Sequence, residues 1–265
     1  MKAKKPSKSI DFTYILKLNT TCYLKSIENG NSKQIKMKNG FNKIYNDSLQ
    51  KPEEFWKNIS EDVFWFKKPT RILNKSNPPF YKWFEDGVTN TCYNALDLHI
   101  DQGRGDKTAL IYDSPITGNK AKFSFNELKE KVSKFAGALD NQGVKKGDRV
   151  IIYMPMIPEA VIAMLACGRI GAIHSVVFGG FASNELASRI DDSKAKVLIT
   201  ASCGFEPGRT VEYRPLVDEA LKLANHKVEK VILYQRKDHE VKLNEPLEIS
   251  WEECLANAKN KDCVE

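Results

Sequence analysis

Two adjacent glycines, Gly179 and Gly180, stand directly after an apolar segment, residues 173–177, that is typical of a strand. Glycine adopts backbone conformations that are closed to other residues, and it lets a ligand approach the main-chain amides. Such a turn could therefore bind a ligand through its backbone. A tight turn between a strand and a helix explains the same pair, and from the glycines alone it is the favoured interpretation.

A second candidate segment, Ser202–Arg209, follows another predicted strand at 196–200. Its proline and glycine restrict the path of the chain, and its final residue is a permanent cation. A planar guanidinium matches phosphate oxygens through two parallel hydrogen bonds. The alternative is that Arg209 pairs with a nearby carboxylate such as Glu212, and the local sequence favours neither interpretation.

The two segments, 178–181 and 202–209, both leave the ends of predicted strands. In an open parallel sheet, ligands bind beyond the carboxyl ends of the strands, where the loops converge. The presence of two such segments at neighbouring strand ends favours a phosphate-bearing ligand that crosses both of them.

Other polar or reactive residues are weaker candidates. His174 lies within an apolar strand, where a hydrogen-bonded core histidine is more common than a catalyst, and Cys167 reads as core packing. Asp191 and Asp192 are expected to form a solvated turn. Arg214 could help to hold an anion, although solvent exposure is the default for arginine. We recognise no Ser-His-Asp arrangement and no Walker-type phosphate loop.

The remaining pattern predicts the elements that must position these residues. Ser124 and Glu127 form a capping box. The apolar positions that follow advance by three and four residues, as on one face of a helix: Phe125, Leu128, Val132, Phe135 and Leu139. Beyond them, strands are predicted at 149–153, 173–177, 196–200 and 230–234, and helices at 158–168, 184–192 and 215–225. This alternation predicts an α/β fold, a parallel sheet of the doubly wound type with helices on both faces.

Three regions divide the chain. Residues 1–42 lack sustained periodicity and are expected to be a flexible basic leader. Residues 43–100 are rich in aromatic side chains, which favours a small helical unit, and residues 101–265 hold the α/β domain. The leader is poor in acids and contains serines, as mitochondrial transit peptides do, but it lacks arginine. A solvated lysine-rich tail is the alternative, so the mitochondrial matrix and the cytoplasm both remain expected locations.

The net charge of +7 is confined to one end of the chain. Residues 1–50 contain ten lysines against three acidic residues, and the remaining chain is electrically balanced. A basic face for nucleic acid is therefore not expected on the folded part. The longest apolar stretch, 150–181, is interrupted by prolines and charges, so no membrane span is expected.

Six cysteines are scattered along the chain without a C-x-x-C pair. A disulfide framework or a zinc site is therefore not expected, and a reducing compartment fits this pattern.

Several of these segments resemble one family. The stretch from Cys92 to Phe181 is similar to the AMP-forming acyl-CoA synthetases of the acetate and propionate type, and within them to the propionate-preferring mitochondrial subgroup. The matching motifs are Ala109-Leu-Ile-Tyr-Asp-Ser-Pro115, Ile152-Tyr-Met-Pro-Met-Ile-Pro158, Arg169 through Phe181, Ser188-Arg-Ile-Asp191 and Glu206-Pro-Gly-Arg209. The aromatic stretch from Phe55 to Trp83 resembles the helical N-terminal extension of that family, so the likeness covers roughly residues 50–265.

The resemblance implies an acid–thiol ligase. Members activate a short-chain carboxylate with ATP, release pyrophosphate, and transfer the acyl group from the adenylate to coenzyme A. ATP and Mg²⁺ would serve the complete enzyme, and its partners would be small molecules. By position, the residues that match the coenzyme A contacts are Glu206, Pro207, Gly208 and Arg209, together with Gly179 and Gly180. Acetate-type members carry arginine where this chain has Glu206, which weakens this assignment without removing it.

The family also has features that the given sequence does not show. A Ser/Thr/Gly-rich ATP loop, the acyl pocket and a C-terminal catalytic lysine would follow the segment that ends at Glu265. The sequence therefore predicts the first part of an adenylate-forming domain, which alone should not form an adenylate. A non-catalytic fragment that binds coenzyme A or a nucleotide, or that docks with another chain, is the alternative. A sheet interrupted at this point should also present an unpaired edge and associate readily.

Overall fold

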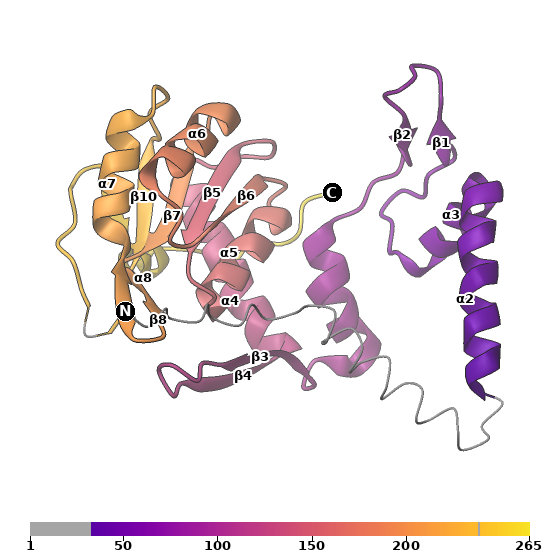
Figure 1. Ribbon diagram of the computed structural model, residues 1–265, viewed down its shortest axis with the longest axis horizontal. Coiled ribbons are helices and arrows are strands. Elements are labelled where there is room, and N and C mark those ends of the chain that lie inside the picture. The colour runs from indigo at the N-terminus through magenta and orange to yellow at the C-terminus, as the bar shows by residue number, and fades with distance from the viewer. Residues whose placement is uncertain (1–32, 238) are drawn as a thin grey trace, which may run out of the picture. The chain divides into compact units, whose positions relative to one another are not determined.

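The computed structural model describes residues 33–237 and 239–265, without the side chains of 33–39 (Figure 1). The chain divides into two compact units, residues 1–62 and 63–265. The flexible leader predicted for residues 1–42 lies largely outside the described residues. The helix α2 (Lys33–Gln50) begins inside that predicted leader. The leader was predicted because residues 1–42 lack an apolar stripe. Most residues of α2 nevertheless have an ordinary helix propensity, and helix propensity does not depend on such a stripe.

The described part of the first unit is helical. After α2 come α3 (Pro52–Ile59) and the short 3₁₀ helix η1 (Ser60–Asp62). Proline occupies the first position of α3, where no amide hydrogen is needed, and acidic residues in its first turn complement the helix dipole.

The aromatic-rich segment 63–90 is mostly irregular chain, and the prediction of a helical unit is wrong there. Its regular structure is a two-residue antiparallel ladder between β1 (Leu73–Asn74) and β2 (Lys82–Trp83) and an isolated antiparallel bridge between Lys67 and Val88. Prolines, which lack an amide hydrogen, divide it. Side-chain hydrogen bonds also stabilise its loops. For example, the Asp86 carboxylate accepts hydrogen bonds from the backbone amides of Thr70 (2.9 Å) and Arg71 (3.2 Å).

Helical turns follow this segment. They include two π-helical stretches, η2 (Tyr93–Asp97) and η3 (Ile100–Arg104). The antiparallel strands β3 (Thr108–Asp113) and β4 (Lys120–Ser124) then lead into α4 (Phe125–Asn141). The predicted capping box is present at the start of α4, with Ser124 accepting from the Glu127 amide and Glu127 accepting from the Ser124 amide.

The main sheet has five parallel strands in the order β11-β10-β7-β5-β6. The strands are β5 (Arg149–Met154), β6 (Ile173–Phe178), β7 (Val197–Ala201), β10 (Lys230–Tyr234) and β11 (Glu248–Ser250). The helices are α5 (Pro158–Arg169), α6 (Ser183–Ser193), α7 (Tyr213–Leu223) and α8 (Trp251–Ala256). All predicted strands and helices of this region occur, with bounds that shift by at most two residues, so the doubly wound α/β prediction is confirmed.

Helices cover both faces of this sheet. One layer contains α4, α5 and α8, and the other contains α6 and α7 (Figure 1). The central strands β5 and β7 are almost entirely buried, which explains their continuous apolar runs. The edge strand β6 is different: Ile173, Val176 and Phe178 are each more than half exposed. The hydrophobic residues that the sequence places in this strand are therefore not all core residues.

Candidate functional site at the carboxyl ends of the strands

The two glycine-containing segments approach each other at the carboxyl ends of β6 and β7. These strands are not the neighbours that the sequence predicts, because β5 lies between them in the sheet. A methyl group added at Gly180 would lie 3.8 Å from Oε1 of Glu206, although the two residues are far apart in sequence. Tyr213, which is only 3% exposed, packs against both Gly179 and Gly204. The structure thus brings together the two segments for which the sequence predicts a shared ligand.

The Gly179–Gly180 turn disfavours side chains at both positions, by steric collision at Gly179 and by backbone conformation at Gly180. A methyl group at Gly179 would collide with the Tyr213 hydroxyl and would lie 2.8 Å from the carbonyl oxygen of Met154. Gly180 has φ of +93°, which disfavours other residues. The hydroxyl of Tyr153 accepts a hydrogen bond from the Gly180 amide (3.2 Å) and donates one to the Phe181 carbonyl (2.8 Å). The turn is therefore fixed by packing and by hydrogen bonds.

The second segment is an antiparallel hairpin, which differs from the loop that the sequence indicates. Strand β8 (Cys203–Glu206) pairs with β9 (Arg209–Glu212). Pro207 and Gly208 form the two-residue turn, with Gly208 at φ of +77°. The hairpin places Glu206 and Arg209 opposite each other at its tip.

At this tip, Arg209 forms an ion pair with Glu206. Its Nη2 lies 2.7 Å and its Nε 2.8 Å from Oε2 of Glu206. The sequence left open whether Arg209 pairs with a nearby carboxylate such as Glu212. It does pair with a carboxylate, but that of Glu206. The side chains are 70% and 40% exposed, and exposed pairs of this kind contribute about 0–1 kcal/mol. An anionic ligand with good geometry could therefore replace the carboxylate as the partner of Arg209.

Sequence reasoning missed Arg236, which lies next to the hairpin. Its guanidinium carbon is 4.8 Å from the centre of the Phe205 ring, and the residue is 9% exposed. The Arg236 amide donates to the Ser202 hydroxyl (2.8 Å), which ties the end of β10 to the start of the hairpin. Within the described residues this guanidinium has no ion pair, so it adds positive charge beside the hairpin. No local motif marks it in the sequence.

Three other candidate residues are not part of this site. Arg214 is bound to two carboxylates, with Nη1 2.6 Å from Glu248 and Nε 3.0 Å from Asp218, so it is neither solvent-exposed nor available to an anion. His174 lies on the exposed edge strand rather than in the core, contrary to the sequence interpretation. Cys167 is fully buried in the core, as predicted.

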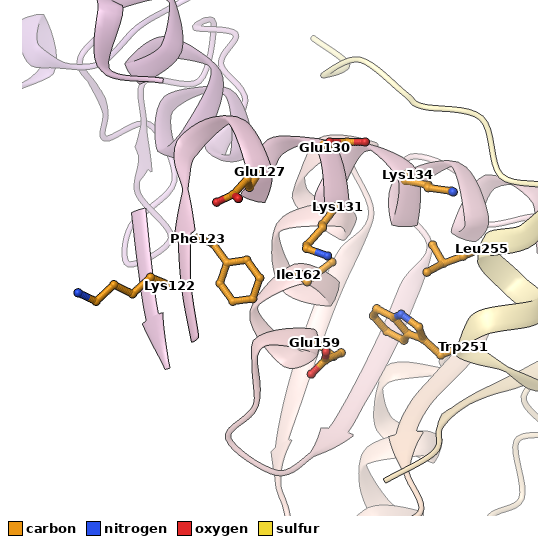
Figure 2. Close-up of a pocket in the computed structure, with 10 residues that line it drawn as sticks. All are labelled: Lys122, Phe123, Glu127, Glu130, Lys131, Lys134, Glu159, Ile162, Trp251 and Leu255. Carbon is orange, nitrogen blue, oxygen red and sulfur yellow. The ribbon is translucent and has the colours of Figure 1, made fainter. Parts of the chain in front are cut away.

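A pocket of about 540 Å³ lies elsewhere, between α4, α5, α8 and β4. Figure 2 shows the Phe123 ring on one side and Trp251 with Leu255 on the other, with Lys131, Ile162 and Glu159 between them. Burial raises the pKa of Glu159. A hydrogen bond from the Tyr234 hydroxyl lowers this pKa, but burial has the larger effect. None of the six predicted ligand-binding residues lines this pocket, and its lysines and glutamates largely balance. We therefore place the candidate site at the strand ends.

One group of side chains in the described residues has the composition of a metal site. The Sγ atoms of Cys92 and Cys263 and a carboxylate oxygen of Asp97 lie within 4.8 Å of one another. The guanidinium of Arg169 already provides their positive partner, with Nη1 2.7 Å from Asp97 and 3.2 Å from Cys263. A metal ion would have to displace this buried cation, so the group does not fit one. Thiolates are also unsuited to Mg²⁺.

None of the helices in residues 33–237 and 239–265 is long and apolar enough to cross a membrane.

Comparison with known proteins places these features in a family. The family model "Acetyl-coenzyme A synthetase N-terminus" matches residues 41–95, and the model "AMP-binding enzyme" matches residues 99–263. The chain is 54% identical over 218 residues to the mitochondrial acyl-CoA synthetase short-chain family member 3 of Rattus norvegicus and to that of Homo sapiens. Each of these matches covers 82% of this chain and 32% of the relative. It is 46% identical to the acetyl-coenzyme A synthetase of Streptomyces avermitilis, over 76% of this chain and 31% of that protein.

A solved structure is also similar. The acetoacetyl-CoA synthetase from Streptomyces lividans superposes with a TM-score of 0.73 at 26% sequence identity, covering 83% of this chain and 33% of that one. The chain thus spans about a third of the length of the relatives that it matches. Because the AMP-binding model matches more than half of its residues, and the extension and the fold agree, this chain belongs to the AMP-binding enzyme family and corresponds to the N-terminal portion of a short-chain acyl-CoA synthetase.

Proposed function

We propose that the Gly179–Gly180 turn and the β8–β9 hairpin bind the nucleotide part of coenzyme A. The observation that carries this proposal is the proximity of Gly180 to Glu206, whose Oε1 would lie 3.8 Å from a methyl group added at Gly180, because it brings both segments within reach of one ligand. The six proposed contact residues are Gly179, Gly180, Glu206, Pro207, Gly208 and Arg209.

The chemistry of the two segments suits a phosphorylated nucleotide. Gly180 presents backbone without a side chain, and the exposed guanidinium of Arg209 can form two parallel hydrogen bonds to a phosphate. Phosphate binding requires Arg209 to leave Glu206, which costs little for an exposed pair. Arg236 adds charge of the right sign behind the hairpin. Glu206 repels phosphate, so its carboxylate is expected to turn away when the ligand binds.

For a protein that contains this sequence and spans the length of its relatives, we propose the activity of an AMP-forming acid–thiol ligase. A short-chain carboxylate, propionate or acetate, is activated by ATP with Mg²⁺, and the coenzyme A thiol takes the acyl group. Among the described residues, the group of three metal-ligating side chains is Cys92, Asp97 and Cys263, which does not fit Mg²⁺. The proposed location is the mitochondrion, which the relatives named as mitochondrial support.

Calorimetric titration of the 265-residue chain with coenzyme A and with dephospho-coenzyme A tests the nucleotide site. Loss of a charge-assisted hydrogen bond costs about 1.5–3 kcal/mol, so Arg209→Ala should weaken coenzyme A binding by roughly ten- to a hundredfold. The loss should be larger for coenzyme A than for the analogue without the 3′-phosphate. Arg71→Ala is a matched control, because Arg71 is also exposed and paired with a glutamate, Glu85.

Equal losses for the two ligands would contradict the phosphate contact, and equal effects of the two substitutions would contradict the site. The alternative is a non-catalytic protein that binds coenzyme A. An assay of pyrophosphate release with propionate and ATP distinguishes it from a ligase. We expect none from the 265-residue chain and release from a longer protein that contains it. Release from neither, with coenzyme A binding retained, would favour the non-catalytic binder.

A further inference from the structure

Two cysteines that are far apart in sequence meet inside the second unit. Cys92 is fully buried and Cys263 is half-buried, and their Sγ atoms lie within 4.8 Å of each other. A disulfide needs its sulfur atoms about 2 Å apart and its β-carbons about 3.5–4.5 Å apart, so the two free thiols must move closer together to form the bond.

The backbone around the pair is held by several specific contacts. Nδ2 of Asn90 donates to the carbonyls of Gly168 (2.9 Å) and Val264 (2.8 Å), and Oδ1 of Asn90 accepts from the Cys92 amide (2.9 Å). The Val264 amide donates to the carbonyl of Arg169 (2.9 Å). One asparagine thus connects the two segments that carry the cysteines, and their approach follows from backbone positions as well as from side-chain rotamers.

Arg169 lies between the sulfurs and an acid. It is 1% exposed, and its Nη1 is 3.6 Å from Sγ of Cys92, 3.2 Å from Sγ of Cys263 and 2.7 Å from Asp97. Its Nε donates to the Lys261 carbonyl (2.6 Å), which holds the segment that carries Cys263. A fixed cation beside a sulfur favours the thiolate, which is the form that attacks disulfides.

We propose that Cys92 and Cys263 are a redox modification site, at which a small disulfide oxidant such as oxidised glutathione forms a reversible bond between them. The half-buried Cys263 first exchanges with the oxidant, which forms a mixed disulfide and releases one glutathione thiol. The thiolate of Cys92 then attacks Sγ of Cys263 and expels the second glutathione. In total, two protein thiols are oxidised to one disulfide, and one glutathione disulfide is reduced to two thiols.

The environments of the cysteines differ in thiol pKa and in exposure. The hydrogen bond from Cys263 and the neighbouring Arg169 hold the pKa of Cys92 below its ordinary value, against the effect of burial. The same contact with Cys92, together with burial, raises the pKa of Cys263, so the first exchange should be the slow step. Cys167, Cys203 and Cys254 are 0%, 1% and 3% exposed, so the oxidant has no access to these thiols, whereas Cys263 is half-buried.

The test is to incubate the native 265-residue chain with oxidised glutathione, quench it in acid and measure its intact mass and its free thiols after denaturation. We expect a loss of two hydrogens and of two of the six thiols, restored by dithiothreitol, and a tryptic peptide pair that links Cys92 to Cys263. Cys92→Ser should instead accumulate one glutathione adduct on Cys263, because the second thiol is missing. Cys263→Ser should show neither product, and Cys254→Ser should behave as the native chain does.

Retention of both thiols in the native chain under conditions that oxidise the urea-unfolded chain would overturn the proposal. A linked peptide pair that involves other cysteines would do the same, and so would a lasting adduct on Cys263 while Cys92 is intact. Because Cys92 is buried and its replacement could disturb the fold, the partly exposed Cys263→Ser keeps the test decisive. Circular dichroism would establish that this variant is folded.

Discussion

The backbone amide of Gly180 donates a hydrogen bond to the hydroxyl of Tyr153, 3.2 Å away. Tyr153 is fully buried in the central strand β5, whereas Gly180 lies at the surface end of the edge strand β6. The conformation of the glycine turn is therefore fixed by a residue of the core. Any ligand that binds to this backbone binds to a turn that is already in place, which reduces the cost of ordering it.

Tyr153→Phe is predicted to loosen the turn without disturbing the core. The variant loses the hydrogen bonds to Gly180 and Phe181, at about 0.5–1.5 kcal/mol each, while the ring keeps its packing against Tyr213. Urea unfolding should show a loss of about 1–3 kcal/mol in the free energy of unfolding. If the turn contacts coenzyme A, affinity should also fall several-fold. Tyr81→Phe, at an exposed tyrosine, should change neither quantity, and an unchanged stability of Tyr153→Phe would contradict the assigned role.

Asp97→Asn is predicted to destabilise the second unit strongly. Arg169 and Asp97 form a two-bond ion pair (2.7 and 3.0 Å) in which both side chains are less than 10% exposed. Removal of one partner leaves a buried charge uncompensated, at about 3–5 kcal/mol. Asp113→Asn removes an exposed pair with Lys120 and should cost less than about 1 kcal/mol. Urea unfolding at neutral pH compares the two, and similar losses would contradict the special role of the buried pair.

The same pair predicts a pH dependence of stability. Burial alone would raise the pKa of Asp97, but hydrogen bonds and charge from Arg169 and Lys129 outweigh it and hold the pKa below its ordinary value. This contribution is therefore fully present above the unfolded pKa of about 3.9 and is lost as the pH falls through the lower folded pKa. Unfolding followed from pH 6 down to pH 2 should show a steeper loss for the native chain than for Asp97→Asn.

Exposed apolar side chains on both faces of the edge strand β6 predict association of the 265-residue chain. Ile173, Val176 and Phe178 are 56%, 53% and 67% exposed on an edge strand, where unpaired backbone groups and apolar side chains favour contact with another chain. Val176→Lys should lower the associated fraction in sedimentation velocity. Ile111→Lys, at a site that is 65% exposed outside this strand, should have a smaller effect. A sharp, monomeric thermal transition of the native chain at high concentration would contradict the prediction.

Local sequence patterns were sufficient to predict the strands of the main sheet but not the β8–β9 hairpin. The alternation of apolar runs and helical stripes predicts β5, β6, β7 and β10 almost to the residue, because burial on both faces requires continuous apolar strands. Strands β8 and β9 have only four residues each and no alternating pattern. The Pro207-Gly208 dipeptide, which is typical of turns, was the available signal for a hairpin. Its strand pairing depends on packing against Tyr213 and Arg236, which the local sequence does not reveal.

By itself, the sequence determined the fold class, the family resemblance and the two segments at the strand ends, because hydrophobic periodicity and turn chemistry act over short distances. Only the tertiary structure decided which distant residues meet. It placed Gly180 beside Glu206, paired Arg209 with Glu206 rather than Glu212, and buried Arg214 against two carboxylates. It also brought Cys92 to Cys263, although the spacing of the cysteines predicts no pair. Such contacts follow from the order of strands in the sheet and from the packing of whole segments.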